Sequence, residues 1–221
     1  MSRVAIVGAH GKVAQQLMRV LYDQGDDFVG IVRNDEHAED VYRLGGEGLL
    51  VDIESADADA LAAAFAGCDA VVFTAGAGGG SGVERKRTVD YAGSVKSAEG
   101  AAKAGVRRFV QVSAWGVDVP VADDAAPDWR AYVEAKRDAD ASLRDSGLDW
   151  TILRPGGLTF EEGTGLVTLG ESVERGSIPR EDVARLIAAC LDEPGTIGKV
   201  WEVVSGDTPL DEAVRALVTP A

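Results

Sequence analysis

The chain begins with a short apolar strand that ends in glycine and is followed at once by a helix. The apolar run Val4–Val7 leads into Gly8 and Gly11, and a helical pattern begins at Lys12. In a parallel sheet, such a strand delivers the chain to the carboxyl edge, where glycines let a phosphate approach the helix N-terminus. Glycines that merely shape a tight turn are the alternative. The context predicts a dinucleotide-binding loop formed by Gly8, Ala9, His10, Gly11, Lys12 and Val13.

The rest of the chain alternates apolar strands with helical patterns. Strands without a polar face, separated by helices, predict a parallel sheet that is covered on both sides. We therefore expect a doubly wound, mostly parallel α/β Rossmann sheet with helices on both faces. Residues 1–221 are expected to form one domain, with a small substrate-side elaboration made mainly by residues 155–221. The expected strands are Val4–Val7, Phe28–Val32, Gly48–Val51, Ala70–Phe73, Phe109–Val112, Trp150–Leu153 and Val200–Val204. The expected helices are Lys12–Gln24, Asp57–Ala66, Val83–Ala104, Trp129–Asp145, Arg180–Leu191 and Leu210–Leu217.

The residue after the second strand predicts which dinucleotide binds. An acidic side chain there accepts hydrogen bonds from the ribose 2′-hydroxyl of NAD, whereas an arginine accommodates the 2′-phosphate of NADP. Arg33 occupies this place, and Lys12 supplies a second cation. Asp35 and Glu36 follow closely and would reverse the preference if one of them took the position of Arg33. NADP is the expected cofactor, and NAD is the alternative.

Charge and composition narrow the classes of partner. The net charge of -15 argues against nucleic acid and anionic membranes, because both are bound through surplus lysine and arginine. No segment approaches the roughly 20 apolar residues of a membrane span. His10 and His37 fall in separate segments, so no metal site is expected. We expect a soluble, cytoplasmic protein with a small-molecule substrate, and either a monomer or a homodimer.

Several motifs are spread along nearly the whole chain. They are Gly8-Ala9-His10-Gly11, Asp52, Thr74-Ala75-Gly76, Val89-Asp90-Tyr91-Ala92-Gly93, Arg108-Phe109-Val110-Gln111-Val112-Ser113, Tyr132-Val133-Glu134-Ala135-Lys136, Leu153-Arg154-Pro155-Gly156 and Arg180-Glu181-Asp182-Val183-Ala184. Together they resemble one family, the atypical short-chain dehydrogenase/reductases that include NmrA-like and biliverdin-reductase-B-like proteins. The resemblance implies an NAD(P)-binding Rossmann fold.

The resemblance also implies roles for the residues at the strand ends. Asp52, with Ile53 beside it, is expected at the adenine edge. Ala75 and Gly76 are expected to line the adenosine and its ribose. The segment near the nicotinamide is matched by Pro155 and Gly156.

Three residues are candidates for the chemistry. Tyr132 and Lys136 are four residues apart and therefore share one face of a helix. By resemblance, the tyrosine hydroxyl exchanges a proton with the substrate oxygen while the lysine holds the nicotinamide ribose and lowers the tyrosine pKa. Ser113 would hydrogen-bond the substrate carbonyl.

Three functions fit this pattern. The first is an NADP(H)-dependent oxidoreductase that transfers a hydride to a small carbonyl, quinone or flavin-like acceptor. The second is a non-enzymatic dinucleotide sensor of the NmrA type, which would have no use for a proton donor. The third is a nucleotide-sugar epimerase or dehydratase, which usually needs a larger C-terminal substrate domain than the residues after Pro155 provide.

Overall fold

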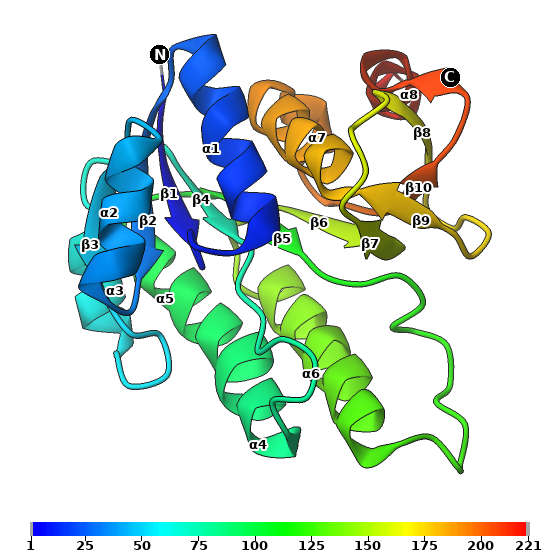
Figure 1. Ribbon diagram of the computed structural model, residues 1–221, viewed down its shortest axis with the longest axis horizontal. Coiled ribbons are helices and arrows are strands. Elements are labelled where there is room, and N and C mark those ends of the chain that lie inside the picture. The colour runs from blue at the N-terminus through cyan, green and yellow to red at the C-terminus, as the bar shows by residue number, and fades with distance from the viewer. Residues whose placement is uncertain (1, 220–221) are drawn as a thin grey trace.

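The computed structural model describes residues 2–219, which form a mostly parallel α/β sandwich (Figure 1). Its strands are β1 (Arg3–Val7), β2 (Asp27–Val32), β3 (Glu47–Leu50), β4 (Ala70–Phe73), β5 (Arg108–Val112), β6 (Asp149–Pro155), β7 (Gly157–Thr159), β8 (Leu166–Gly170), β9 (Ser177–Pro179), β10 (Lys199–Ser205) and β11 (Thr208–Pro209). Its helices are α1 (Lys12–Gln24), α2 (Asp35–Arg43), α3 (Ala58–Ala64), α4 (Val83–Arg85), the π-helix η1 (Lys86–Gly93), α5 (Ser94–Ala104), α6 (Pro127–Arg144), α7 (Arg180–Asp192), the 3-10 helix η2 (Pro194–Thr196) and α8 (Leu210–Val218).

The nine strands of the main sheet, within the described part of the chain, follow the order β11-β8-β10-β6-β5-β4-β1-β2-β3. All neighbours from β10 to β3 are parallel, and the β10–β8 and β8–β11 pairs are antiparallel. The chain reverses its direction of progress across the sheet between β1 and β4. The strands β1 and β4 therefore form the topological switch point of the sheet, and ligands bind at the carboxyl edge beside this point in such folds.

Two cores cover the two faces of this sheet. Along β1, Val4 and Ile6 point into one core, and Ala5 and Val7 point into the other, as strand alternation requires. Helices α1, α2, α7 and α8 pack on the first face, and α3, α5 and α6 pack on the second (Figure 1). The predicted fold class is confirmed.

The sequence missed one helix and the short strands beyond β6. Helix α2 is absent from the predicted helices, because Val41 is its only buried residue and gives little hydrophobic periodicity. Its N-cap is Asn34, whose side chain accepts a hydrogen bond from the His37 backbone N–H at 2.9 Å. The strands β7, β8, β9 and β11 were also missed, because two to five residues carry little periodicity.

Within residues 2–219, no helix is both long and apolar enough to cross a membrane. The same residues contain no group of three or more histidine, cysteine or acidic side chains placed to hold a metal ion.

Candidate functional site

The loop after β1 is shaped by a glycine that the fold requires. Gly8 has a φ of 82°, and a Cβ atom there would lie 2.7 Å from the Cα atom of Ala75. The loops after β1 and β4 approach each other so closely only because the side chain is absent. The loop is closed by a hydrogen bond from the Gly11 N–H to the Gly8 carbonyl at 2.8 Å.

One predicted loop residue does not line the site. The Ala9 side chain is fully buried, and its backbone N–H donates to the Ile31 carbonyl at 3.3 Å. Ala9 therefore anchors the loop to β2. The N–H groups of Lys12 and Val13, at the start of α1, have no intrahelical acceptor and remain suited to a phosphate.

Two cavities join along the carboxyl edge into one groove. The narrow cavity has a volume of about 270 Å³ and the wide one about 1130 Å³, and Gly11, Thr74, Ala75 and Gly76 line both. All the predicted site residues except Ala9 line this groove. The narrow cavity is lined by Gly8, His10, Gly11, Arg33, Asp52, Ile53, Ala75 and Gly76. The wide cavity adds Lys12, Val13, Ser113, Tyr132, Lys136, Pro155 and Gly156.

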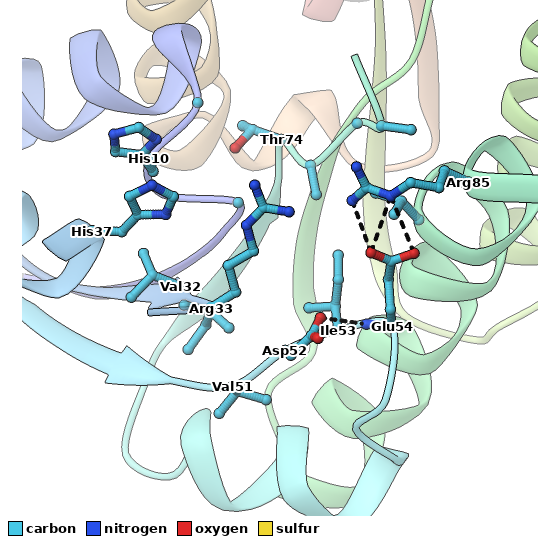
Figure 2. Close-up of a pocket in the computed structure, with 17 residues that line it drawn as sticks. His10, Val32, Arg33, His37, Val51, Asp52, Ile53, Glu54, Thr74 and Arg85 are labelled. Carbon is cyan, nitrogen blue, oxygen red and sulfur yellow. Dashed lines mark hydrogen bonds and ion pairs between the residues drawn. The ribbon is translucent and has the colours of Figure 1, made fainter. Parts of the chain in front are cut away.

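The narrow cavity contains a free cation and a pair of stacked imidazoles. Arg33 is exposed, makes no hydrogen bond or ion pair within residues 2–219, and extends into the cavity (Figure 2). The rings of His10 and His37 stack with centroids 3.5 Å apart and planes inclined by 6°. Sequence reasoning had separated the two histidines, because it did not predict α2. The Nε2 atom of His10 lies 3.3 Å from an Asp40 carboxylate oxygen.

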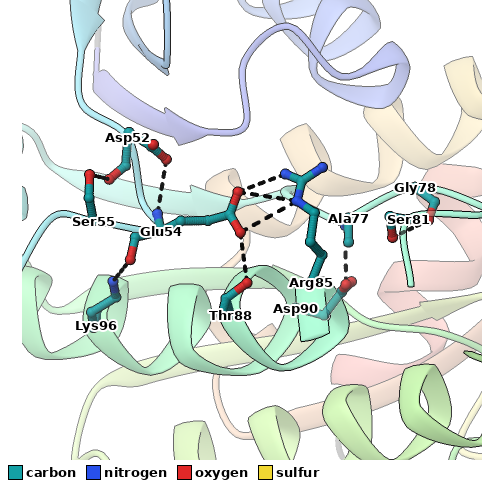
Figure 3. Close-up of polar contacts among 10 residues, drawn as sticks. All are labelled: Asp52, Glu54, Ser55, Ala77, Gly78, Ser81, Arg85, Thr88, Asp90 and Lys96. Carbon is teal, nitrogen blue, oxygen red and sulfur yellow. Dashed lines mark hydrogen bonds and ion pairs between the residues drawn. The ribbon is translucent and has the colours of Figure 1, made fainter. Parts of the chain in front are cut away.

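The turn after β3 is fixed against the helix on the other side of the narrow cavity. Glu54 accepts a hydrogen bond from Arg85 Nη2 at 2.8 Å and one from the Thr88 hydroxyl at 2.7 Å (Figure 3). Lys96 Nζ donates to the backbone carbonyl of Glu54 at 3.2 Å. These bonds hold Asp52 and Ile53 at the cavity wall. Sequence reasoning missed Glu54 and Arg85 because their pairing spans 31 residues.

A buried ion pair holds the candidate lysine in the wide cavity. The Lys136 ammonium lies 3.3 Å from Asp90 Oδ1, and the two side chains are 6% and 0% exposed. Lys136 also donates to the Val112 carbonyl at 3.2 Å. Asp90 belongs to η1, and its other oxygen accepts from the Ala77 N–H at 3.1 Å (Figure 3). The lysine is therefore positioned by a carboxylate as well as by the strand ends.

Tyr132 lies one helical turn before Lys136, in the same cavity. Burial raises the pKa of its hydroxyl, the nearby Lys136 ammonium lowers it, and Asp90 and Asp140 raise it further. The net shift is upward, so the phenol stays protonated at neutral pH. This state suits a proton donor better than a proton acceptor.

Ser113 is tied to a buried polar network behind the cavity. Its hydroxyl donates to Asp140 at 2.9 Å, and the same carboxylate binds Gln111 Nε2 at 2.7 Å and Arg154 Nε at 2.9 Å. Burial raises the pKa of the Asp140 carboxyl, and the Arg154 charge opposes the shift. The serine proton points away from the cavity in this arrangement. Its role as a donor to substrate stays a prediction, and Asp140 joins the candidate residues as the group that orients it.

Residues 8–194 match the model of a family described as NAD(P)H-binding. The chain belongs to this family. It is 39% identical over 216 residues to "Uncharacterized sugar epimerase YhfK" of Bacillus subtilis, covering 97% of this chain and 100% of that one. The predicted NAD(P)-binding family is confirmed.

Two solved structures share both fold and sequence. A "putative NAD-dependent epimerase/dehydratase" from Bacillus halodurans is 40% identical, with a TM-score of 0.90 and coverage of 98% of this chain and 100% of that one. The "oxidoreductase ylbE" from Lactococcus lactis is 30% identical, with a TM-score of 0.87 and coverage of 98% and 96%. Their names point to two different reactions on one cofactor-binding fold.

Proposed function

We propose that this protein is an NADP(H)-dependent oxidoreductase that reduces a small carbonyl, quinone or flavin-like acceptor. The observation that carries the proposal is the placing of Tyr132 and Lys136 in the wide end of a groove whose narrow end presents the free cation of Arg33. The residues fit a dinucleotide. Gly8 leaves the loop close to Ala75, the start of α1 offers N–H groups to a pyrophosphate, and Asp52 faces the narrow cavity.

In the proposed reaction, the protein donates a proton and binds both the nicotinamide cofactor and the acceptor. Bound NADPH would supply the hydride for the carbonyl carbon of the acceptor. Tyr132 gives its hydroxyl proton to the carbonyl oxygen, so the product is an alcohol. Lys136 holds a ribose hydroxyl and favours the phenolate that remains, and solvent then reprotonates Tyr132.

The choice of NADP over NAD rests on Arg33. Arg33→Asp should weaken NADPH binding by about 1.5–3 kcal/mol while leaving NADH binding unchanged or improved, because a charge-assisted bond to the 2′-phosphate is lost. Calorimetric titration with both dinucleotides measures the change. Arg87→Gln is the matched control, since Arg87 is exposed and lines neither cavity. Equal affinity of the unaltered protein for NADPH and NADH would contradict the proposal.

The stacked histidines should make NADPH affinity depend on pH. Burial and the neighbouring His10 ring lower the pKa of His37, so the free protein holds this imidazole neutral at pH 7. Arg33 also lowers this pKa, while Glu36 and Asp40 raise it, and Arg43 pairs with Asp40 at 2.8 Å. A bound 2′-phosphate dianion would favour protonation of His37.

We therefore expect NADPH to bind with proton uptake. Its Kd should rise by up to about tenfold per pH unit between pH 6.5 and 8.5, a range in which the phosphate stays mostly dianionic. The Kd of NADH should vary little. His37→Phe keeps a ring for stacking but cannot titrate, and it should flatten the NADPH profile. Parallel profiles for the two dinucleotides would refute proton-coupled recognition.

The names of the relatives favour a second candidate, a sugar epimerase. Such an enzyme would oxidise and re-reduce one sugar without net consumption of NADPH. Incubation with nucleotide sugars, followed by chromatographic separation of epimers, tests this directly. A dinucleotide sensor would produce no epimers from nucleotide sugars. It would also cause no net oxidation of NADPH with a panel of aldehydes, quinones and flavins.

A further inference from the structure

One buried cation in the wide cavity has no acidic partner. Among residues 2–219, the buried lysine and arginine residues are Lys86, Lys136 and Arg154, whose exposed fractions are 4%, 5% and 5%. Lys136 pairs with Asp90, and Arg154 pairs with Asp118 and Asp140. The Lys86 ammonium instead donates to the Gly78 carbonyl and makes no ion pair within the same residues. An unpaired buried ammonium is costly, so an anion from outside the chain would stabilise it.

Lys86 lies against the candidate proton donor. Its Nζ atom is 5.4 Å from the centroid of the Tyr132 ring, and both residues line the wide cavity. Arg85, at the end of α4, lines the narrow cavity, and its neighbour Lys86, at the start of η1, lines the wide one. Asp90 does not neutralise Lys86 from one turn away, since its carboxylate is taken by Lys136 and the Ala77 N–H.

The wide cavity is basic although the chain is strongly acidic. Its lining includes the basic residues Lys12, Lys86, Lys136, Arg175 and Arg180 and the acidic residues Asp90 and Asp128. The whole chain carries a net charge of -15. Lys12 and Lys136 are accounted for by the proposed cofactor, which leaves an excess of positive charge for another ligand. Arg175 is exposed and makes no hydrogen bond or ion pair within the described residues.

Arg180 and Asp128 complete the charges around this cavity. Arg180 is held by a hydrogen bond to the Leu158 carbonyl at 3.1 Å, and its guanidinium lies 3.9 Å from the centroid of the Phe160 ring. The Oδ1 atom of Asp128 is buried and has no hydrogen-bond partner among the described residues. Asp128 and Lys86 form no ion pair with each other within the described residues.

We propose that Lys86, assisted by Arg175, binds an anionic group of the acceptor, a carboxylate, phosphate or sulfonate, beside Tyr132. The inference rests on the proposed reductase function and names the chemical class of its substrate. The anion would offset the buried charge of Lys86 and hold the reducible group of the same molecule near the phenol. Neutral acceptors of the same shape would lack this anchor.

Matched acceptors test the proposal. FMN and riboflavin share one reducible ring and differ by a phosphate, and 4-carboxybenzaldehyde and benzaldehyde differ by a carboxylate. With NADPH, kcat/KM should be about tenfold or more higher for the anionic member, and Lys86→Met should abolish the preference without changing the Kd of NADPH. Lys103→Met is the control, because Lys103 is an exposed residue paired with Asp59 outside both cavities.

A binding measurement separates failure of this inference from failure of the reductase proposal. With saturating NADP⁺, benzoate should raise the melting temperature of the unaltered protein, and benzamide should not. Lys86→Met should lose the benzoate effect. The exposed Arg175→Gln should reduce it and serves as the test if Lys86→Met does not fold. Protection by benzoate without turnover of any acceptor supports the anion subsite and rejects the reductase. Equal use of anionic and neutral acceptors, absence of benzoate protection, or loss of NADPH affinity in Lys86→Met overturns the subsite.

Discussion

Replacing Tyr132 by Phe should lower kcat for a carbonyl acceptor by a factor on the order of 10²–10⁴, with the Kd of NADPH unchanged. Only the proton donor is removed, and the ring keeps its place beside Trp129, 5.6 Å between centroids, and under the Lys86 ammonium. Steady-state NADPH oxidation measures kcat, and calorimetric titration measures the Kd. A quinone or flavin accepts its proton from solvent, so the same variant should have a nearly unchanged kcat with those acceptors.

Tyr91→Phe is the control for this substitution. Tyr91 is 39% exposed and lines neither cavity, so the change should alter neither kcat nor the Kd of NADPH. Unchanged turnover of a carbonyl acceptor by Tyr132→Phe would show that the phenol is a bystander. A loss of cofactor affinity as large as the loss of kcat would instead indicate damage to the groove.

Replacing Lys136 by Met should lower the free energy of unfolding by about 3–5 kcal/mol, because it leaves the Asp90 carboxylate buried and unpaired. Asp90 is 0% exposed, and its Oδ1 atom has no hydrogen-bond partner within residues 2–219 apart from the Lys136 ion pair at 3.3 Å. Urea unfolding monitored by tryptophan fluorescence measures the change. Cofactor affinity should fall as well, since the lysine is also expected to hold the ribose.

A double variant separates the ion pair from other effects of the substitution. Lys136→Met combined with Asp90→Leu removes both charges, and it should recover most of the lost stability but none of the cofactor affinity. Lys103→Met, which removes a solvent-exposed pair 2.6 Å long, should leave the free energy of unfolding nearly unchanged. Equal stability of Lys136→Met and the unaltered protein would contradict the importance of the buried pair.

The parts of the fold that sequence predicts well are those with continuous apolar runs. Strands such as Ala70–Phe73 are buried on both faces and bounded by helices, so hydrophobicity alone locates them. Helix α2 is not predicted, because it lies on the surface with one buried residue. Asn34 followed by acidic residues is nevertheless a recognisable N-cap signal. That omission concealed the stacking of His10 and His37.

The candidate site also has a part that the sequence predicts and a part that it does not. Glycine spacing and strand ends located the narrow cavity, because Rossmann geometry fixes where those residues lie. The roles of Lys86 and Asp90 depend on η1, whose π-helical geometry does not follow from residue spacing. The Ser113–Asp140 bond joins residues 27 positions apart, and no local pattern reveals it. Long-range polar pairing is therefore what the structure adds.

Transfer of deuterium from the cofactor to an acceptor is the most direct test of the proposed reaction. NADPH carrying deuterium at the reactive nicotinamide carbon would be mixed with the protein and the paired anionic and neutral acceptors. The masses of the products would then be measured by mass spectrometry. The proposal predicts one deuterium on the former carbonyl carbon of 4-carboxybenzaldehyde, and loss of this transfer in Tyr132→Phe. Tight NADPH binding with no oxidation of the cofactor by any aldehyde, quinone or flavin would contradict it.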